Sequence, residues 1–102
     1  MEPTGAIIGK DPNAANWPRG VDWTDYLAAI GAAETVTVST WTVSGPDAVL
    51  TADAGSIVVG GKQTQVRLSA GTVGALYTVT NRITTSSGVI DDGSFLVLIE
   101  QA

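Results

Sequence analysis

The sequence predicts an all-β fold, an Ig-like Greek-key β-sandwich of about six or seven strands with minimal helix. Stretches rich in valine, threonine and isoleucine alternate apolar and polar residues with a period of two, which is typical of half-buried strands. Turn-forming residues separate these stretches at short intervals. The 102 residues include 12 glycines, and 44% are hydrophobic, a composition that favours one small domain of strands and tight turns.

The first 20 residues differ from the rest because they hold three of the four prolines. Proline cannot donate to a β-ladder, so we expect an extended arm over residues 1–20 and the Ig-like sandwich over residues 21–102. Two interpretations of the arm are open. It is either a loosely ordered terminus or a segment that docks on a neighbouring subunit through Ile7, Ile8 and Trp17. For Trp17, the alternative is that it folds back over the edge of the sandwich.

The segment after the arm predicts a short strand and then one helical turn. Trp23 belongs to the strand and faces the core. Thr24 or Asp25 is suited to cap a helical turn that runs through Leu27. Tyr26, within this turn, has no obvious place in the core, so we add it to the expected interface residues.

The next predicted strand, within residues 34–44, changes phase along its length. Val36 and Val38 occupy even positions, whereas Trp41 and Val43 occupy odd positions. A β-bulge near residues 39–40 explains the change and is the interpretation we favour. The alternative is that Trp41 points away from the first two valines.

The rest of the chain predicts short strands and a long closing hairpin. Short strands are expected at residues 49–52, 56–59 and 64–68, and the hairpin spans Tyr77–Ile99. A glycine-containing loop leads directly into Tyr77, which predicts a tyrosine corner, where the phenol bonds back to the loop. The large residues that we expect in the core are Trp23, Trp41, Tyr77, Val79, Phe95 and Val97.

Residue types that support most enzyme chemistry are missing from the chain. It has no histidine and no cysteine, which excludes disulfides, thiolate metal sites and the commonest general base. Asp22 and Asp25 could act as an acid/base pair, but an outward strand position and a helix cap explain them better. Asp91 and Asp92 could bind calcium, but they lack the spacing of a calcium loop and suit a solvated turn. We therefore expect no enzyme activity, no cofactor and no metal.

Charge and hydropathy exclude further classes of partner. Ten acidic and five basic residues give a net charge of −5, without the basic footprint of a nucleic-acid-binding protein. No stretch approaches the roughly 18 apolar residues that span a membrane. The N-terminus lacks the basic start and apolar run of a signal peptide, so we expect the chain to fold in the cytoplasm.

Short patterns occur in a fixed order at residues 10–27, 39–50 and 70–97. They begin with KDP, continue with DWTDYL and STWTV, and end with the string YTVTNRITT followed by DDGSF. In order and spacing these patterns resemble small virion proteins of tailed bacteriophages, the fiber–tail adaptor proteins. The link at residues 13–20 is longer or looser than in the family pattern, which leaves the path of the arm open.

The resemblance implies an Ig-like sandwich that assembles in several copies on the virion and has no catalytic residues. We therefore expect a structural protein that links the tail or head–tail neck to tail fibers through other virion proteins and copies of itself. One alternative is a capsid decoration protein. A second is a carbohydrate-binding module in which Trp17 and Trp23 form a stacking platform.

Overall fold

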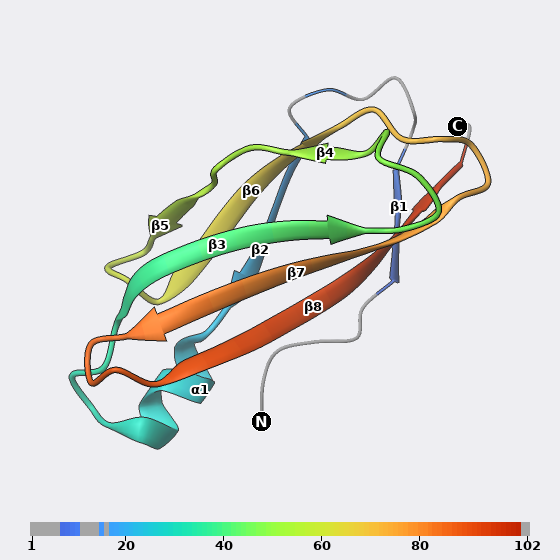
Figure 1. The fold of residues 1–102 in the computed structure, drawn as a ribbon. Helices are drawn as coiled ribbons and strands as arrows, with labels where there is room; N and C mark the ends of the chain where they lie inside the picture. The colour runs from blue at the N-terminus through green and yellow to red at the C-terminus, as the bar shows by residue number, and fades with distance from the viewer. Residues whose placement is uncertain (1–6, 11–14, 16, 101–102) are drawn as a thin grey trace.

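The computed structural model describes residues 7–10, 15 and 17–100, which form two sheets packed face to face (Figure 1). One sheet has the strand order β1-β8-β7-β3, and the other has the order β2-β6-β4, with β5 also paired to β6. The elements described are β1 (Ile7–Lys10), β2 (Trp17–Asp22), α1 (Thr24–Ile30), β3 (Val36–Ser44), β4 (Thr51–Ala52), β5 (Ser56–Val58), β6 (Gln63–Ser69), β7 (Leu76–Thr85) and β8 (Ile90–Ile99).

The connectivity is that of an Ig-like Greek key. Strands β2, β6 and β4 take the places of strands B, E and D, and β3, β7 and β8 take those of C, F and G. The chain changes sheet from β1 to β2, from β2 to β3, from β3 to β4 and again from β6 to β7 (Figure 1). The all-β sandwich is therefore confirmed, and it contains more strands than expected because β1 lies parallel to β8, with Ile7 opposite Leu96.

The hairpin of β7 and β8 supplies the centre of the core. Tyr77 lies opposite Val97 and Val79 lies opposite Phe95, and the alternating residues of both strands face the other sheet. Trp23, from the other half of the sandwich, is fully buried against them. The buried cluster consists of Val21, Trp23, Leu27, Val36, Leu50, Val66, Leu68, Tyr77, Val79, Ile83, Phe95, Val97 and Ile99.

A polar network crosses the interior of the sandwich. Asn81 is fully buried, and its Oδ1 accepts hydrogen bonds from Trp23 Nε1 at 3.1 Å and Thr64 Oγ1 at 2.6 Å. Its Nδ2 donates to Ser39 Oγ at 2.8 Å and to the Thr40 carbonyl at 3.0 Å. Because every polar atom of this amide is bonded, the network fixes how the two sheets face each other.

The tyrosine corner is present. Tyr77 Oη accepts a hydrogen bond from the Thr72 backbone N–H at 3.1 Å. The same hydroxyl donates to Asp47 Oδ1 at 2.5 Å, so it ties the β6–β7 loop to the segment that follows β3. This contact lowers the pKa of Asp47 below its usual value.

The described part of the N-terminal segment lies within the sheets and does not form a separate arm. Strand β2 pairs antiparallel with β6, from Trp17 opposite Leu68 to Asp22 opposite Gln63, so the predicted boundary at residue 20 falls inside a strand. Pro18 is tolerated because β2 is an edge strand and needs ladder bonds on one side alone. The other predictions for residues 1–6, 11–14 and 16 lie outside the described residues.

Helix α1 begins after Trp23, and its cap differs from the prediction. The Thr24 N–H and hydroxyl both donate to Asp22 Oδ1, at 3.0 Å and 2.6 Å, so Asp22 orders the start of the helix. Neither Thr24 nor Asp25 caps it, because both already belong to the helix. The Gly31 N–H donates to the Leu27 carbonyl at 3.0 Å at its end.

The β-bulge in β3 lies earlier than predicted. The register against β7 shifts between Val36 and Val38, whereas we expected the shift near residues 39–40. Val36 is therefore buried, Val38 is 50% exposed, and Trp41 returns to the inner side, opposite Asn81. Trp41 is half-buried and packs edge-on against Phe95, with the ring centroids 6.3 Å apart.

Candidate interaction surfaces

The outward face of the β1-β8-β7-β3 sheet is built from rows of residues that run across the strands. Threonine and serine dominate the central rows, so we call this surface the threonine face. The register aligns Val38–Thr84–Ile90, Thr40–Arg82–Asp92, Thr42–Thr80–Ser94, Ser44–Thr78–Leu96 and the pair Leu76–Leu98.

The centre of the threonine face is electrically neutral. Arg82 donates to Asp92 through two bonds, Nε to Oδ1 at 2.8 Å and Nη2 to Oδ2 at 3.1 Å. This bidentate pair lowers the pKa of Asp92 and raises that of Arg82, so both stay charged and compensate each other. Together with Thr40, Thr42 and Thr80 they line a hollow of about 190 Å³. The pair is exposed and contributes little to stability.

Apolar residues lie at both ends of the threonine face. Val38 and Ile90, which is 64% exposed, flank Thr84 at one end, and Leu76 is exposed at the other. These exposed apolar ends are the parts of the threonine face best suited to contact with another protein.

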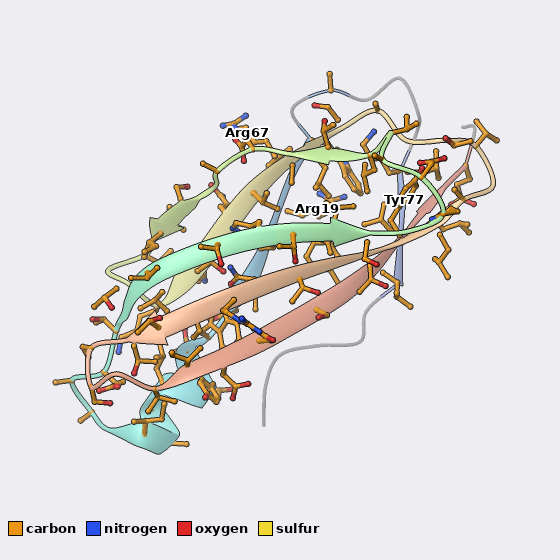
Figure 2. The ribbon with its side chains drawn as sticks, in the orientation of Figure 1. Arg19, Arg67 and Tyr77 are labelled. Carbon is orange, nitrogen blue, oxygen red and sulfur yellow. The ribbon has the colours of Figure 1, made fainter. Side chains whose placement is uncertain are left out.

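The edges of the two sheets differ in how well they are protected against strand addition. β1 has four residues, whereas β4 and β5 have two and three. β2 carries Pro18, and its Arg19 faces inward with its guanidinium carbon 3.6 Å from the centroid of the Trp17 ring. Figure 2 shows Arg19 between the two sheets, whereas Arg67 points away from them. Short strands, proline and inward charge all discourage edge pairing.

Strand β3 has none of these protections. It is nine residues long and contains no charged residue and no proline. Its bulge, at Thr37, lies at one end, so the stretch from Val38 to Ser44 runs in regular register with β7. This is the longest unprotected edge in the described part of the chain.

The expected interface residues that the structure describes in full make contacts within the chain. Trp17 is half-buried and packs on the core cluster, as in the interpretation that it folds back over the sandwich edge. Tyr26 donates to Asp91 Oδ2 at 2.7 Å and packs edge-on against Trp23 at 5.3 Å. Ile7 and Ile8 lie in edge strand β1.

The alternative that Trp17 and Trp23 form a stacking platform for a sugar is wrong. Trp23 has no exposed surface, because it fills the core and bonds to Asn81. A sugar ring therefore has no access to its face. The platform was an alternative to the core position expected for Trp23, and it required an exposed ring that the structure does not have.

The acidic residues considered for catalysis or metal binding have separate structural partners. Asp22 bonds to Thr24, which lowers its pKa. Asp91 and Asp92 lie in strand β8 and not in a turn, and they bond to Tyr26 and Arg82 on opposite faces. Among the described residues, no group of three or more aspartate or glutamate side chains lies close enough together to hold a metal ion.

Sequence reasoning missed the role of Glu34. Its carboxylate accepts hydrogen bonds from the Ser87 N–H at 3.1 Å, from Ser86 Oγ at 3.2 Å and from Ser87 Oγ. Its carbonyl accepts one from Lys62 Nζ at 2.7 Å. The hydroxyl of Ser87 is the main reason that the pKa of Glu34 falls to about 2. Glu34 thus holds the β7–β8 turn against the start of β3, and no local pattern indicates such a distant contact.

Comparison with known proteins identifies the family of the chain. No curated protein matches the chain. No helix in the described residues has the length and apolar character needed to cross a bilayer. Residues 10–98 match the model of the family described as podophage GP4 fiber-tail adaptor protein gp77. Because this match covers most of the chain, the chain belongs to the podophage fiber-tail adaptor family.

Proposed function

We propose that this protein is a structural adaptor in a phage tail that joins the tail, or the head–tail neck, to the tail fibers. The observation that carries the proposal is the family match over residues 10–98. The neutral threonine face and the unprotected edge of β3 support a role in protein–protein contact. We propose no catalytic step for it.

The proposed partners are tail, neck and fiber proteins together with further copies of this chain. A net charge of −5 argues against nucleic acid as a partner, and the proposal includes no membrane and no small-molecule substrate. A sandwich without cysteine can fold and assemble in the reducing cytoplasm of the host, before the virion is released.

A phage lacking the gene tests the proposal. Particles made without the protein should retain filled heads and a normal ratio of portal to major capsid protein but lose their fibers. Complementation with the intact gene should restore them. Mutant particles that keep a full set of fibers would contradict the adaptor role.

Copy number on purified particles provides the second measurement. Quantitative mass spectrometry should give a ratio to the portal protein that is small and constant, as for a ring at the neck or tail. A ratio that follows the major capsid protein would instead identify a capsid decoration protein and overturn the proposal.

We propose further that Ile7 and Ile8, with Trp17 and Tyr26, contribute to contacts with neighbouring virion proteins. The support is that β1 and β2, which hold Ile7, Ile8 and Trp17, are edge strands, and that Trp17 and Tyr26 keep part of their surface exposed. The double variant Ile7→Ser, Ile8→Ser should reduce incorporation into particles while thermal unfolding of the isolated protein stays unchanged. If stability falls in parallel with incorporation, the two isoleucines serve the fold and not the interface.

A further inference from the structure

We propose that the free edge of β3 pairs antiparallel with the β3 edge of a second copy of this chain. The contact would join two four-stranded β1-β8-β7-β3 sheets into one continuous sheet across a two-fold axis. The proposed function includes contact between copies of the chain but does not say which strands meet, and this pairing names them. It depends on the proposed function only for its place in the virion.

One side of β3 offers an open ladder of backbone hydrogen-bonding groups. β3 pairs with β7 on one side. On the other side the Val36 N–H donates to the Gly61 carbonyl at 2.8 Å, and no described strand pairs with the remainder of that edge. Alternate residues of an edge strand direct their N–H and C=O groups outward, which makes the edge a template for another strand.

Strand β3 is complementary to itself. A two-fold axis at this edge makes the strand meet itself antiparallel, so residues of Val38–Ser44 face residues of the same stretch. Every member is uncharged, and all except Trp41 are valine, threonine or serine. Any register therefore avoids facing charges and forms cross-strand pairs of the stabilising type.

No other described edge of a second copy fits β3 as well. β1, with four residues, would leave half of β3 unpaired. β2 is interrupted by Pro18, and β4 and β5 have two and three residues. The net charge of −5 on each copy also favours contact through a strand that carries no charge.

Pairing at this edge would also extend the packing of both faces. Val38, Thr40 and Thr42 would continue the rows of the threonine face into the second copy. On the inner side, Trp41 and Val43 are half-buried, and the neighbouring strand would cover part of their remaining exposed surface.

Sedimentation equilibrium of the purified protein tests the proposal. The wild type should show a concentration-dependent dimer. Thr42→Lys places a like charge near the axis in both copies and should raise the dimer dissociation constant by about tenfold. Thr51→Lys, which makes the same change of charge on exposed strand β4, is the matched control and should leave the dimer unchanged. An equimolar mixture of Thr42→Lys and Thr42→Glu should form dimer at lower concentration than either variant alone.

Single cysteines identify the pairing strand, because the wild-type chain has none. Cysteine placed in turn at Val38, Thr40, Thr42 and Ser44 should give an intermolecular disulfide that is strongest at the residue closest to the axis. Cysteine at Thr51 should give none. A wild-type protein that stays monomeric at every concentration, or a dimer unaffected by Thr42→Lys, would overturn the pairing. Neither result would contradict the adaptor proposal, because that proposal is tested separately by the loss of fibers from mutant particles.

Discussion

The indole nitrogen of Trp23 and Oδ1 of Asn81 lie 3.1 Å apart and join the residue that precedes α1 to the middle of β7. The bond lies in the interior, where both residues are fully buried. Asn81 uses its amide nitrogen at the same time to hold Ser39 and Thr40 of β3. One side chain therefore links three separate parts of the sandwich.

Replacing Asn81 by leucine should lower the free energy of unfolding by about 2–4 kcal/mol, because buried donors and acceptors lose their partner. Urea unfolding measures the change. Thr80→Val, on the neighbouring outward position of the same strand, is the control and should cost less than about 1 kcal/mol. Equal effects of the two changes would show that the buried network adds no stability.

Removing the hydroxyl of Tyr77 should lower the free energy of unfolding by about 1–3 kcal/mol, because Tyr77→Phe leaves the Thr72 N–H without its partner and removes one of the hydrogen bonds to Asp47. Tyr26→Phe removes the bond to Asp91 from a half-buried position and should cost less. Urea unfolding of both variants makes the comparison. A larger loss for Tyr26→Phe would contradict the importance of the tyrosine corner.

Stability should fall in acid because of Glu34. The folded-state pKa of Glu34 is about 2, below the unfolded value of 4.5, so its contribution is complete above about pH 4.5 and is lost as the pH falls toward 2. Glu34→Gln should weaken this dependence. Thermal unfolding of both proteins between those pH values tests it, and parallel curves would contradict the assignment.

Truncation of Trp41 should be costly although the residue is half-buried. Its ring packs edge-on against Phe95 and on the core cluster, so Trp41→Ala should lower the free energy of unfolding by about 2–4 kcal/mol. Denaturant unfolding gives the value. A loss well below 1 kcal/mol would place Trp41 on the surface in solution.

Two glycines with positive φ should respond differently to alanine. A Cβ on Gly55, with φ of +72°, would lie 2.4 Å from the Gln65 carbonyl oxygen and 2.6 Å from Trp41 Nε1. Gly60, with φ of +62°, has open space at the same position. We expect Gly60→Ala to cost about 1 kcal/mol from backbone strain and Gly55→Ala to cost distinctly more. Denaturant unfolding of both variants makes the comparison. Equal losses of stability would show that the structure around Gly55 relaxes easily to accept a Cβ.

The sequence predicted the parts of the fold that depend on local periodicity. The alternation in Tyr77–Ile99 identifies which residues of β7 face inward, and the loop before Tyr77 indicates the tyrosine corner. The family patterns indicated a fiber–tail adaptor, and the match over residues 10–98 confirms the family.

Features that depend on distant partners were not predictable in the same way. The pairing of β2 with β6 shows that a proline in an edge strand does not exclude a sheet, although the local pattern suggested an arm. The bulge at Thr37 depends on the register with β7, and valine spacing alone placed it too late. Glu34 meets Ser87 only after both sheets have formed.

The parallel pairing of β1 with β8 affects how the protein is made. Ile7 lies opposite Leu96, so the two strands are separated by nearly the whole described chain. During translation, β1 leaves the ribosome long before its partner exists. The sheet edge beside β8 can therefore close only after synthesis has passed Ile99, and until then the nascent chain must be kept from pairing β1 elsewhere.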